Sequence, residues 1–398
     1  MVAGHLQEKK GLFYIVLNYK DVNNKRKTKW IPTGLTVKGN KKRAEAMLME
    51  ARKSFIPEIS QETASITQKM LFADFLKKWL QVVKSTIQPV TYSSYSGMLD
   101  SIIEPFFRQK RTTLVGLQAQ DIHDFYSEQL ERVKANTVIH YHAIIHRALK
   151  YAVKMDLISI NPADKVELPK KERFVANFYD SDEMNQLFTI VRDTPLELPV
   201  MLAAFYGLRR SEVVGLKWDA IDFNRNTITI QHTITTCTIA GKRVEIASDK
   251  TKTRASMRTL PLVPSFRDML LQLQEQQKVN RQLCGRSYCN DYLDYVCVND
   301  IGVRIKPGYL SLALPKLLEK HQMRVIRFHD LRHSCASLLL ANGVTIKQIQ
   351  EWLGHSDFST TANIYAHLDY QSKLSSADAM LAGLGMGTHN ISTSTKNL

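Results

Sequence analysis

Apolar residues recur at helical spacing from residue 70 to residue 155. This periodicity predicts helices that bury one face in a common core. Three interruptions divide the segment into four helices: at Pro89, around Thr112 and at Lys134. Asn136 or Thr137 could cap the fourth helix, because both residue types accept hydrogen bonds from the free N–H groups of a first turn. The apolar positions of the first helix are Phe72, Phe75, Leu76, Trp79, Leu80 and Val83.

The first 57 residues show a different pattern. Residues 12–19 are rich in aromatic and β-branched types. A turn-prone run at 21–25 follows and leads into residues 26–32, which together predict a β-hairpin. A helix is expected from Lys41 to Phe55, where apolar residues recur on one side. We therefore expect a small sheet with one helix at the N-terminus.

Helical and strand patterns are mixed beyond residue 174. The alternation from Thr227 to His232 predicts a strand, and Ala240-Gly241 predicts a turn into a second strand. Residues 258–262 predict a third strand, so we expect a three-stranded antiparallel edge sheet within a helical domain. The other elements expected here are helices near 181–192, near 195–206 and over most of 264–381, with a short apolar strand at 295–298.

The length of the chain predicts two or three domains, and its pattern predicts an α+β fold that is mainly α. Two polar or charged stretches have the composition of linkers. The expected order is a sheet-and-helix domain (1–57), a linker (58–68), a four-helix domain (69–160), a linker (161–174), a mixed helical domain with a small three-stranded sheet (175–383) and a mobile tail (384–398).

The charge of the chain is strongly positive, with 54 lysine and arginine residues, 38 aspartate and glutamate residues and a formal net charge of +16. Such an excess favours a polyanionic partner. Residues 1–57 contain 13 basic and four acidic residues, so more than half of the net charge lies in this segment. A concentrated basic block is typical of a separate DNA-contacting module, although a solvated surface would have the same composition.

Membrane, secreted and zinc-binding classes receive no support from the sequence. The longest mainly apolar stretch, residues 196–208, contains Glu197, Pro199 and Gly207 and is shorter than the roughly 20 residues of a membrane span. The first residues have no apolar signal region. The five cysteines form no CxxC pair, which predicts reduced thiols that serve in packing. The protein is therefore expected to be soluble and cytoplasmic.

Several short motifs contain groups that could act on a phosphodiester. Arg209 is followed three residues later by Glu212, a spacing that lets the carboxylate orient the guanidinium. His329 and Arg332 are also three residues apart, so both could reach one phosphate. Each motif has an ordinary explanation when it is taken alone: a surface ion pair for Arg209, a helix cap for His355, a half-buried core residue for Tyr365 and a basic loop for Lys252.

The order and spacing of the motifs together are more specific. The chain contains, in sequence, Gly-Leu-Arg-x-Ser-Glu, a Lys-Thr turn before a Leu-Pro-Leu strand end, His-Asp-Leu-Arg-His, Leu-Gly-His and Thr-Thr-x-x-x-Tyr-x-His. This series resembles the active-site motifs of the tyrosine recombinases, the phage integrase family. The resemblance is strong over residues 175–370. Residues 136–163 look more loosely like the last helix of that family's core-binding domain, and the N-terminus is similar in arrangement to the arm-binding domains of integrases from conjugative transposons and temperate phages.

The resemblance implies a site-specific DNA recombinase that cuts and rejoins DNA through a covalent 3′-phosphotyrosine, with Tyr365 as the nucleophile. The groups implied around the scissile phosphate, with Glu212 in support, are Arg209, Lys252, His329, Arg332 and His355. Paired guanidiniums suit the charge of the transition state, and a lysine suits protonation of the leaving 5′-oxygen. Lys252 fits the family spacing, and Lys250 is its rival. No metal, cofactor or ATP is expected, because no carboxylate cluster or phosphate-binding loop accompanies these motifs.

The implied partner is double-stranded DNA, bound at core and arm-type sites by a tetramer that assembles on it, with accessory excision or DNA-bending proteins. Residues 376–381 are a candidate for docking on a neighbouring copy, and association with the nucleoid is expected. The candidate DNA contacts are Lys25, Arg26, Lys27, Lys29, Lys41, Lys42, Arg43, Tyr92, Lys134, Asn136, Thr137, Lys170, Lys171 and Arg173.

Two alternatives stay open at this point. A type IB topoisomerase-like enzyme would need the same pocket, and a DNA-binding regulator could keep the pocket without its activity. The complete set of motifs argues against the regulator. The basic N-terminal module argues against a plain topoisomerase, because a second DNA-binding domain serves to bridge separate sites.

Overall fold

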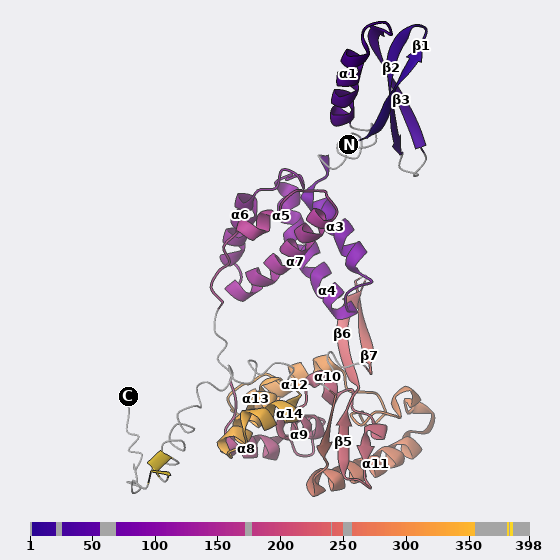
Figure 1. Cartoon of the computed structure of the whole chain (residues 1–398). Helices are drawn as coiled ribbons and strands as arrows, with labels where there is room; N and C mark the ends of the chain where they lie inside the picture. Colours follow the sequence, from indigo (N-terminus) through magenta and orange to yellow (C-terminus); the bar gives the residue numbers. More distant parts are fainter. Residues whose placement is uncertain are drawn as a thin grey trace. The chain divides into compact units, whose positions relative to one another are not determined.

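A small sheet with one helix comes first along the chain, a group of helices follows, and a mixed unit comes last (Figure 1). The computed structural model describes residues 2–20, 26–55, 69–171, 177–239, 241–249, 257–354, 380–381 and 383–384. The chain divides into two units, Met1–Glu172 and Arg173–Leu398, and each is described by itself. Among the described residues, no helix is both long and apolar enough to cross a membrane.

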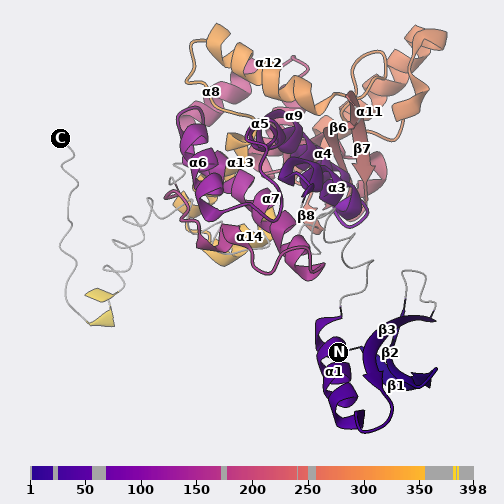
Figure 2. The ribbon, with the colours of Figure 1, turned by 90° about the horizontal axis from the view of Figure 1, so that it is seen from above.

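The N-terminal sheet consists of three antiparallel strands, in the order β1 (Ala3–Lys9), β2 (Leu12–Lys20) and β3 (Arg26–Thr36). Lys10 and Gly11 join β1 to β2 and both have positive φ, as a two-residue hairpin turn requires. The helix α1 (Lys41–Ser54) covers one face of the sheet (Figure 1, Figure 2). The predicted hairpin is therefore confirmed as β2 and β3, and β1 is a strand that the sequence pattern did not predict.

The helical group consists of α3 (Phe72–Val83), α4 (Pro89–Met98), α5 (Glu104–Gln109), α6 (Ala119–Leu130) and α7 (Ala135–Lys154). A π-helical turn, Leu99–Ile103, joins α4 to α5 with helical dihedral angles at both junctions. These elements therefore form one helix, and the prediction of four helices over residues 70–155 is confirmed. Aromatic rings fill the centre of this core, with the centroid of Phe107 4.9 Å from that of Phe72 and 5.4 Å from that of Phe125.

The predicted cap of the fourth helix is wrong. α7 begins at Ala135, and the backbone carbonyl of Lys134 accepts hydrogen bonds from the N–H groups of Thr137 and Val138. The helix thus starts one residue before Asn136, so Asn136 and Thr137 lie inside the first turn. Lys154 lies in the last turn of α7, where its positive charge interacts favourably with the unpaired backbone carbonyls at the helix end.

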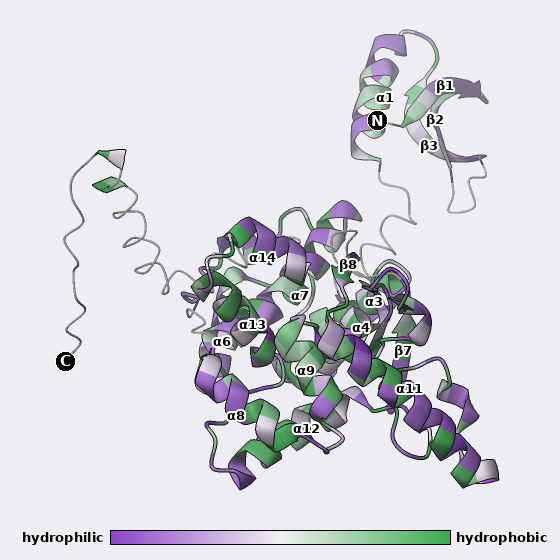
Figure 3. Cartoon of the chain, turned by 90° about the horizontal axis from the view of Figure 1, so that it is seen from below, coloured by the Kyte–Doolittle hydropathy of each residue, from purple (hydrophilic) through white to green (hydrophobic). Residues whose placement is uncertain are grey.

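The second unit is built around one apolar core. Its helices in the described part of the chain are α8 (Ser181–Val191), α9 (Glu197–Phe205), α10 (Arg210–Val213), α11 (Pro264–Cys284), α12 (Pro307–Lys320), α13 (Asp330–Ala341) and α14 (Ile346–Leu353). α9 is mainly apolar in Figure 3, and most of its residues are buried. α13 packs against α9 and α14, which brings segments far apart in the sequence to one place.

The strands of this unit differ in part from the prediction. A three-stranded antiparallel sheet is present, but its order is β4 (Ile221–Asp222), β5 (Thr227–Ile230) and β8 (Arg258–Pro261). The strand predicted after Ala240-Gly241 instead pairs as β7 (Lys242–Ser248) with β6 (Thr233–Ile239), in a separate two-stranded sheet. The strand predicted at 295–298 is wrong, because these residues make only isolated bridges to Lys217 and Arg304.

The chain passes from β5 to β6 at Gln231 and His232, and the His232 ring contacts residues far away in the sequence. The His232 ring is buried, and its Nε2 lies 3.1 Å from the hydroxyl of Tyr295, while Nδ1 is paired with Asp249. The backbone here is also close to Gly215, where an added Cβ would lie 2.8 Å from the carbonyl oxygen of His232. A strand ladder continuous through His232 is therefore replaced by side-chain bonding and close backbone packing.

Candidate active site

Arg209 and Glu212 lie at the start of α10 and contact each other as predicted. Nη1 of Arg209 donates to Oε1 of Glu212 at 2.6 Å, and the backbone N–H of Arg209 donates to Oε2 at 2.9 Å. Nη2 of Arg209 donates to the carbonyl of Gly354 at 3.1 Å. The Arg209 side chain is 32% exposed and that of Glu212 is 2% exposed. The guanidinium is thus fixed on two sides and still has a surface open to solvent.

Arg332 lies in the first turn of α13 and is 1% exposed. Nη1 donates to the carbonyl of Gly207 at 2.5 Å, and Nη2 donates to the carbonyl of Leu353 at 2.7 Å. Burial, followed by the positive charge of Arg209, lowers the pKa of Arg332 to about 9, so the guanidinium is still charged at neutral pH. A phosphate could contact this group only after the atoms that cover it move.

Gly207 allows the backbone to approach this closely. Its φ is +63°, a left-handed conformation that favours glycine, and an added Cβ would lie 2.2 Å from Cδ2 of Leu353. A larger residue would be strained at this φ and would displace the side chain of Leu353, whose carbonyl Arg332 uses. The glycine in the Gly-Leu-Arg motif is therefore required by packing around the two arginines.

The end of α14 is the point where both arginines meet. Leu353 and Gly354 supply the carbonyls that Arg332 and Arg209 bond. Gly354 has a φ of 68° and ends α14, as a glycine in the left-handed conformation commonly does. The next residue in the chain is His355. His355, Lys252 with its rival Lys250, and Tyr365 lie outside the described residues, as do most of residues 376–381, so their roles stay predictions.

A third arginine, Arg258, joins this group, and sequence reasoning missed it. Nη2 of Arg258 donates to Oε2 of Glu212 at 3.0 Å, and Nη1 lies 3.4 Å from Oε1. Arg258 and Leu260 are buried in β8, while Thr259 and Pro261 are exposed. A charged residue at a position that alternates with buried apolar residues is a sign of a buried ion pair, and this sign is visible in the sequence.

Glu212 is the carboxylate that holds the arginines together. Burial raises the pKa of Glu212, but the charge and hydrogen bonds of Arg258, with the charges of Arg209 and Arg332, outweigh it and lower the pKa to about 2. Glu212 is therefore ionised at neutral pH. Three guanidiniums around one carboxylate leave an excess of positive charge that an anion would neutralise.

His329 directly precedes α13 and is exposed, whereas Arg332, three residues later in the same motif, is buried. Its ring centroid lies 5.2 Å from that of His333 in an edge-on contact. Partial desolvation, with His333, Arg332 and Arg209, lowers the pKa of His329 to about 4. The imidazole is thus neutral at pH 7 and can accept a proton. Asp330 fixes the turn before it by accepting the backbone N–H of Arg327 at 2.8 Å.

The predicted DNA contacts that the structure describes lie in several separate segments of the chain. The basic residues that the structure describes are all exposed, on β3, on the first turn of α1, before α7 and after the helical group: Arg26, Lys27, Lys29, Lys41, Lys42, Arg43, Lys134, Lys170 and Lys171. Asn136 and Thr137 are half-buried in the first turn of α7. Lys25 and Arg173 lie outside the described residues.

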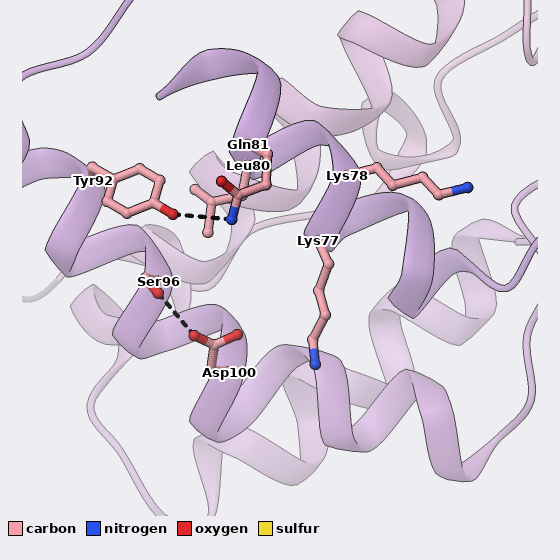
Figure 4. A pocket seen from close by; sticks show the side chains of 7 residues that line it. All are labelled: Lys77, Lys78, Leu80, Gln81, Tyr92, Ser96 and Asp100. Atoms are coloured by element: carbon pink, nitrogen blue, oxygen red, sulfur yellow. Dashed lines mark hydrogen bonds between the residues drawn. The ribbon is translucent and has the colours of Figure 1, made fainter. Parts of the chain in front are cut away.

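Tyr92 lines a hollow of about 340 Å³ between α3 and α4, together with Lys77, Lys78, Gln81 and Asp100 (Figure 4). Nε2 of Gln81 donates to the hydroxyl of Tyr92 at 3.2 Å, which holds the ring against α3. Sequence reasoning missed both lysines. Lys77 and Lys78 lie between the buried pairs Phe75-Leu76 and Trp79-Leu80, so helical periodicity places both off the buried face of α3.

Within the described ranges, no group of three or more histidine, cysteine, aspartate or glutamate side chains is arranged to hold a metal ion. All five cysteines are free thiols, and three of them are buried. Cys335 packs in the pocket region, with its Sγ 3.1 Å from the carbonyl oxygen of Phe205. This agrees with the prediction that the cysteines serve in packing.

Comparison with known proteins gives two family matches. Residues 177–372 match the phage integrase family, and residues 71–130 match the N-terminal SAM-like domain of phage integrases. A XerC-like tyrosine recombinase of Caldanaerobacter subterraneus subsp. tengcongensis is 27% identical over 329 residues, covering 79% of this chain and 83% of the relative.

Solved structures show the same fold. The Tn1549 transposon integrase in complex with a circular intermediate DNA matches with a TM-score of 0.65 at 15% identity, over 78% of this chain and 99% of that one. A lambda integrase tetramer bound to a Holliday junction matches with a TM-score of 0.55 at 15% identity, over 88% of this chain and 95% of that one. At this identity the likeness establishes the α+β architecture.

The motifs, the arginine pair and the two family matches agree with one another. They do not favour the topoisomerase-like or regulator alternatives. The chain therefore belongs to the phage integrase family and is a tyrosine-type site-specific DNA recombinase.

Proposed function

We propose that this recombinase cuts and rejoins DNA through a covalent 3′-phosphotyrosine at Tyr365, without a metal ion or ATP. The observation that carries the proposal is the convergence of Arg209 and Arg332 on the carbonyls of Leu353 and Gly354. These carbonyls directly precede the motifs that contain His355 and Tyr365 in the sequence. Two guanidiniums are thus tied to the segment of chain that leads to the nucleophile.

In the proposed reaction the Tyr365 oxygen attacks the scissile phosphorus, and the bond from phosphorus to the 5′-oxygen breaks. The phenol proton leaves toward His329, whose imidazole is unprotonated at neutral pH because its pKa is about 4. The 5′-oxygen takes a proton from Lys252. The phosphotyrosine retains the energy of the broken bond, so a 5′-hydroxyl of another strand can reverse the step and rejoin the DNA.

The arginines stabilise the charge that builds on the non-bridging oxygens. Guanidinium is suited to this task because its planar N–H groups donate paired hydrogen bonds and its charge persists in a desolvated site. His355 is proposed to donate a further hydrogen bond to the phosphate. The excess positive charge around Glu212 supports binding of an anion at this point.

The proposed partner is double-stranded DNA. Of the integrases that share this fold, that of Tn1549 is in complex with a circular intermediate DNA, and that of lambda is a tetramer bound to a Holliday junction. We infer the same kind of assembly here, with the exposed basic residues around α7 and the hollow at Tyr92 along the phosphate backbone. Accessory excision or DNA-bending proteins, and a location in the bacterial nucleoid, belong to the same proposal.

The division into a module at residues 1–57, a helical domain at 69–160 and a catalytic domain at 175–383 is also part of the proposal. In the first module, Leu17 faces α1 beside Leu48, so the alternation of the strands directs Tyr14 and Trp30 to the opposite face. The rings of Tyr14 and Trp30 lie 6.2 Å apart, and the Lys9 ammonium lies 5.6 Å from the Trp30 ring. A basic sheet face with an exposed tryptophan beside a half-buried tyrosine supports a role in reading a DNA groove.

Covalent adduct formation tests the reaction. The full chain, incubated with a nicked duplex that carries the joined ends of its mobile element, should form a protein–DNA adduct that survives denaturing electrophoresis. The adduct should form equally in EDTA, because side chains neutralise the phosphate charge in the proposed mechanism. A chemical step that stops in EDTA and resumes on addition of Mg²⁺ would assign the protein a different mechanism.

Removal of residues 1–57 tests the proposed arm-binding module. Because these residues are strongly basic, the truncated protein should keep cleavage of a short core-site duplex and lose recombination between full sites. Its binding to long DNA should also depend less steeply on salt, since fewer counterions are released. Equal losses of core-site cleavage and of long-DNA binding would instead make the module part of the catalytic clamp.

A further inference from the structure

Arg258 lies between the Lys-Thr turn and the Leu-Pro-Leu strand end, where the resemblance assigns it no role, yet it contacts the carboxylate of Glu212. We propose that Arg258 is a positioning residue for strand cleavage: by holding both oxygens of Glu212 it fixes the guanidinium of Arg209 toward the scissile phosphate. The inference rests on the proposed function, since it assumes that Arg209 acts on a phosphate there. Arg258 itself would touch neither DNA nor the reacting atoms.

Hydrogen bonds connect Arg258 to Arg209 through the carboxylate of Glu212. Each oxygen of Glu212 is shared by the two arginines: Oε1 accepts from Nη1 of Arg209 at 2.6 Å and lies 3.4 Å from Nη1 of Arg258. Oε2 accepts from the backbone N–H of Arg209 at 2.9 Å and from Nη2 of Arg258 at 3.0 Å. Contacts on both oxygens stop the carboxylate from rotating, and the carboxylate in turn fixes the backbone and the guanidinium of Arg209.

Arg258, Glu212 and Arg209 differ in how far their side chains are buried. The side chains of Arg258 and Glu212 are 6% and 2% exposed, whereas that of Arg209 is 32% exposed. Arg258 is anchored in β8, where its backbone is paired with Ile230 of β5. The rigid sheet thus holds Arg258, Arg258 holds Glu212, and only Arg209 at the end of this chain of contacts is open to a ligand.

Charge points in the same direction. The groups facing Glu212 are Arg209 before α10, Arg258 on β8 and Arg332 on α13. Burial raises the pKa of Glu212, and Arg258 is the largest of the effects that lower it. Without Arg258 the pKa of Glu212 would rise, and protonation would remove the charge and one of the acceptors that orient Arg209.

The test uses single-turnover cleavage of the nicked duplex by the full-length protein, with DNA binding and thermal unfolding measured in parallel. Arg258→Lys keeps the charge and loses the two-pronged contact, and should slow cleavage by about tenfold or more with binding unchanged. Arg304→Lys is the matched control, because the Arg304 side chain is also 6% exposed and pairs with a carboxylate, that of Glu245 on β7, instead of Glu212. It should perturb folding similarly and leave cleavage within about threefold of the wild type.

The pH profile separates positioning from folding. In Arg258→Met, cleavage should fall from about pH 8 to about pH 5 more steeply than in the wild type, as Glu212 becomes protonated. Arg258→Met with Glu212→Gln should lack this extra fall, because no carboxyl group is left to titrate. Arg258→Met should slow cleavage far less in the Glu212→Gln background than in the wild type, because both residues act through one contact.

Two outcomes would overturn the inference. One is an Arg258→Met variant whose cleavage loss is additive with that of Glu212→Gln and has the wild-type pH profile. The other is a loss of cleavage by Arg258→Lys that the Arg304→Lys control matches. Failure of the wild-type protein itself to form the adduct would reject the proposed function instead, so the two failures are distinguishable.

Discussion

Replacement of Tyr365 by phenylalanine is expected to abolish the covalent protein–DNA adduct and leave DNA binding intact. The substitution removes only the phenolic oxygen, which is the atom proposed to bond to phosphorus. The adduct should fall below detection on the nicked duplex, while the dissociation constant for an intact core-site duplex stays within about threefold of the wild type. The measurement is denaturing electrophoresis of the adduct, with an electrophoretic mobility shift for binding.

A second tyrosine serves as the control for this experiment. Tyr309 lies on α12 and is 43% exposed, so Tyr309→Phe also removes one accessible phenolic oxygen. It should form the adduct at the wild-type rate. An adduct that persists in Tyr365→Phe would remove Tyr365 from the role of nucleophile, even though the family motif selects it.

Much of the fold could be predicted from hydrophobic periodicity, because the spacing of apolar residues along an element determines which face is buried. Phe72, Phe75, Leu76 and Trp79 recur at helical intervals and are all buried in α3. The hairpin of β2 and β3 was predictable because β-branched and aromatic residues flank a turn-prone run. β1 was missed because most of its residues are exposed, so its sequence has little apolar alternation.

The exchange of strands between sheets could not be predicted from local pattern. The alternation of residues 227–232 continues through His232, but this ring is committed to Tyr295 and Asp249, which are distant in sequence. The close approach of Gly215 to the same backbone is also a tertiary effect. Long-range side-chain bonding therefore ended a strand that local propensity would have continued.

The site, like the fold, has contacts that could be predicted from the sequence and contacts that could not. The contact of Arg209 with Glu212 follows from local spacing, and the end of α14 at Gly354 follows from the glycine itself. Arg258 lies 46 residues from Glu212 in sequence, and only the sheet brings them together. The selection of Lys252, His355 and Tyr365 depends on the resemblance to the family, and it stays a prediction.

Loss of either pocket arginine is expected to slow cleavage strongly, but the two losses should differ in their effect on folding. Arg209→Ala should cost about 3 kcal/mol or more in the barrier to cleavage, roughly a hundredfold or worse, as for the removal of one preorganised donor. Because the Arg209 side chain is 32% exposed and Glu212 keeps Arg258, the free energy of unfolding should fall by only about 1 kcal/mol.

Arg332→Ala should combine the same loss of cleavage with a larger loss of stability. The buried guanidinium donates to the carbonyls of Gly207 and Leu353, and both would lose a partner in a region closed to water. We expect a loss of about 3 kcal/mol or more in the free energy of unfolding, in addition to the cavity that the side chain leaves. Denaturant unfolding of both variants, with cleavage rates measured well below their melting temperatures, checks this contrast.

Arg332→Lys separates the two effects further, because a lysine keeps a charge in the pocket but can hardly reach both carbonyls at once. It should recover part of the stability and little of the cleavage. Cleavage by Arg332→Lys within about threefold of the wild type would mean that charge alone suffices at this position. In that case Arg332 would act through its charge, its bonds to the carbonyls of Gly207 and Leu353 would not be needed for cleavage, and the paired contact with the phosphate would belong to Arg209 alone.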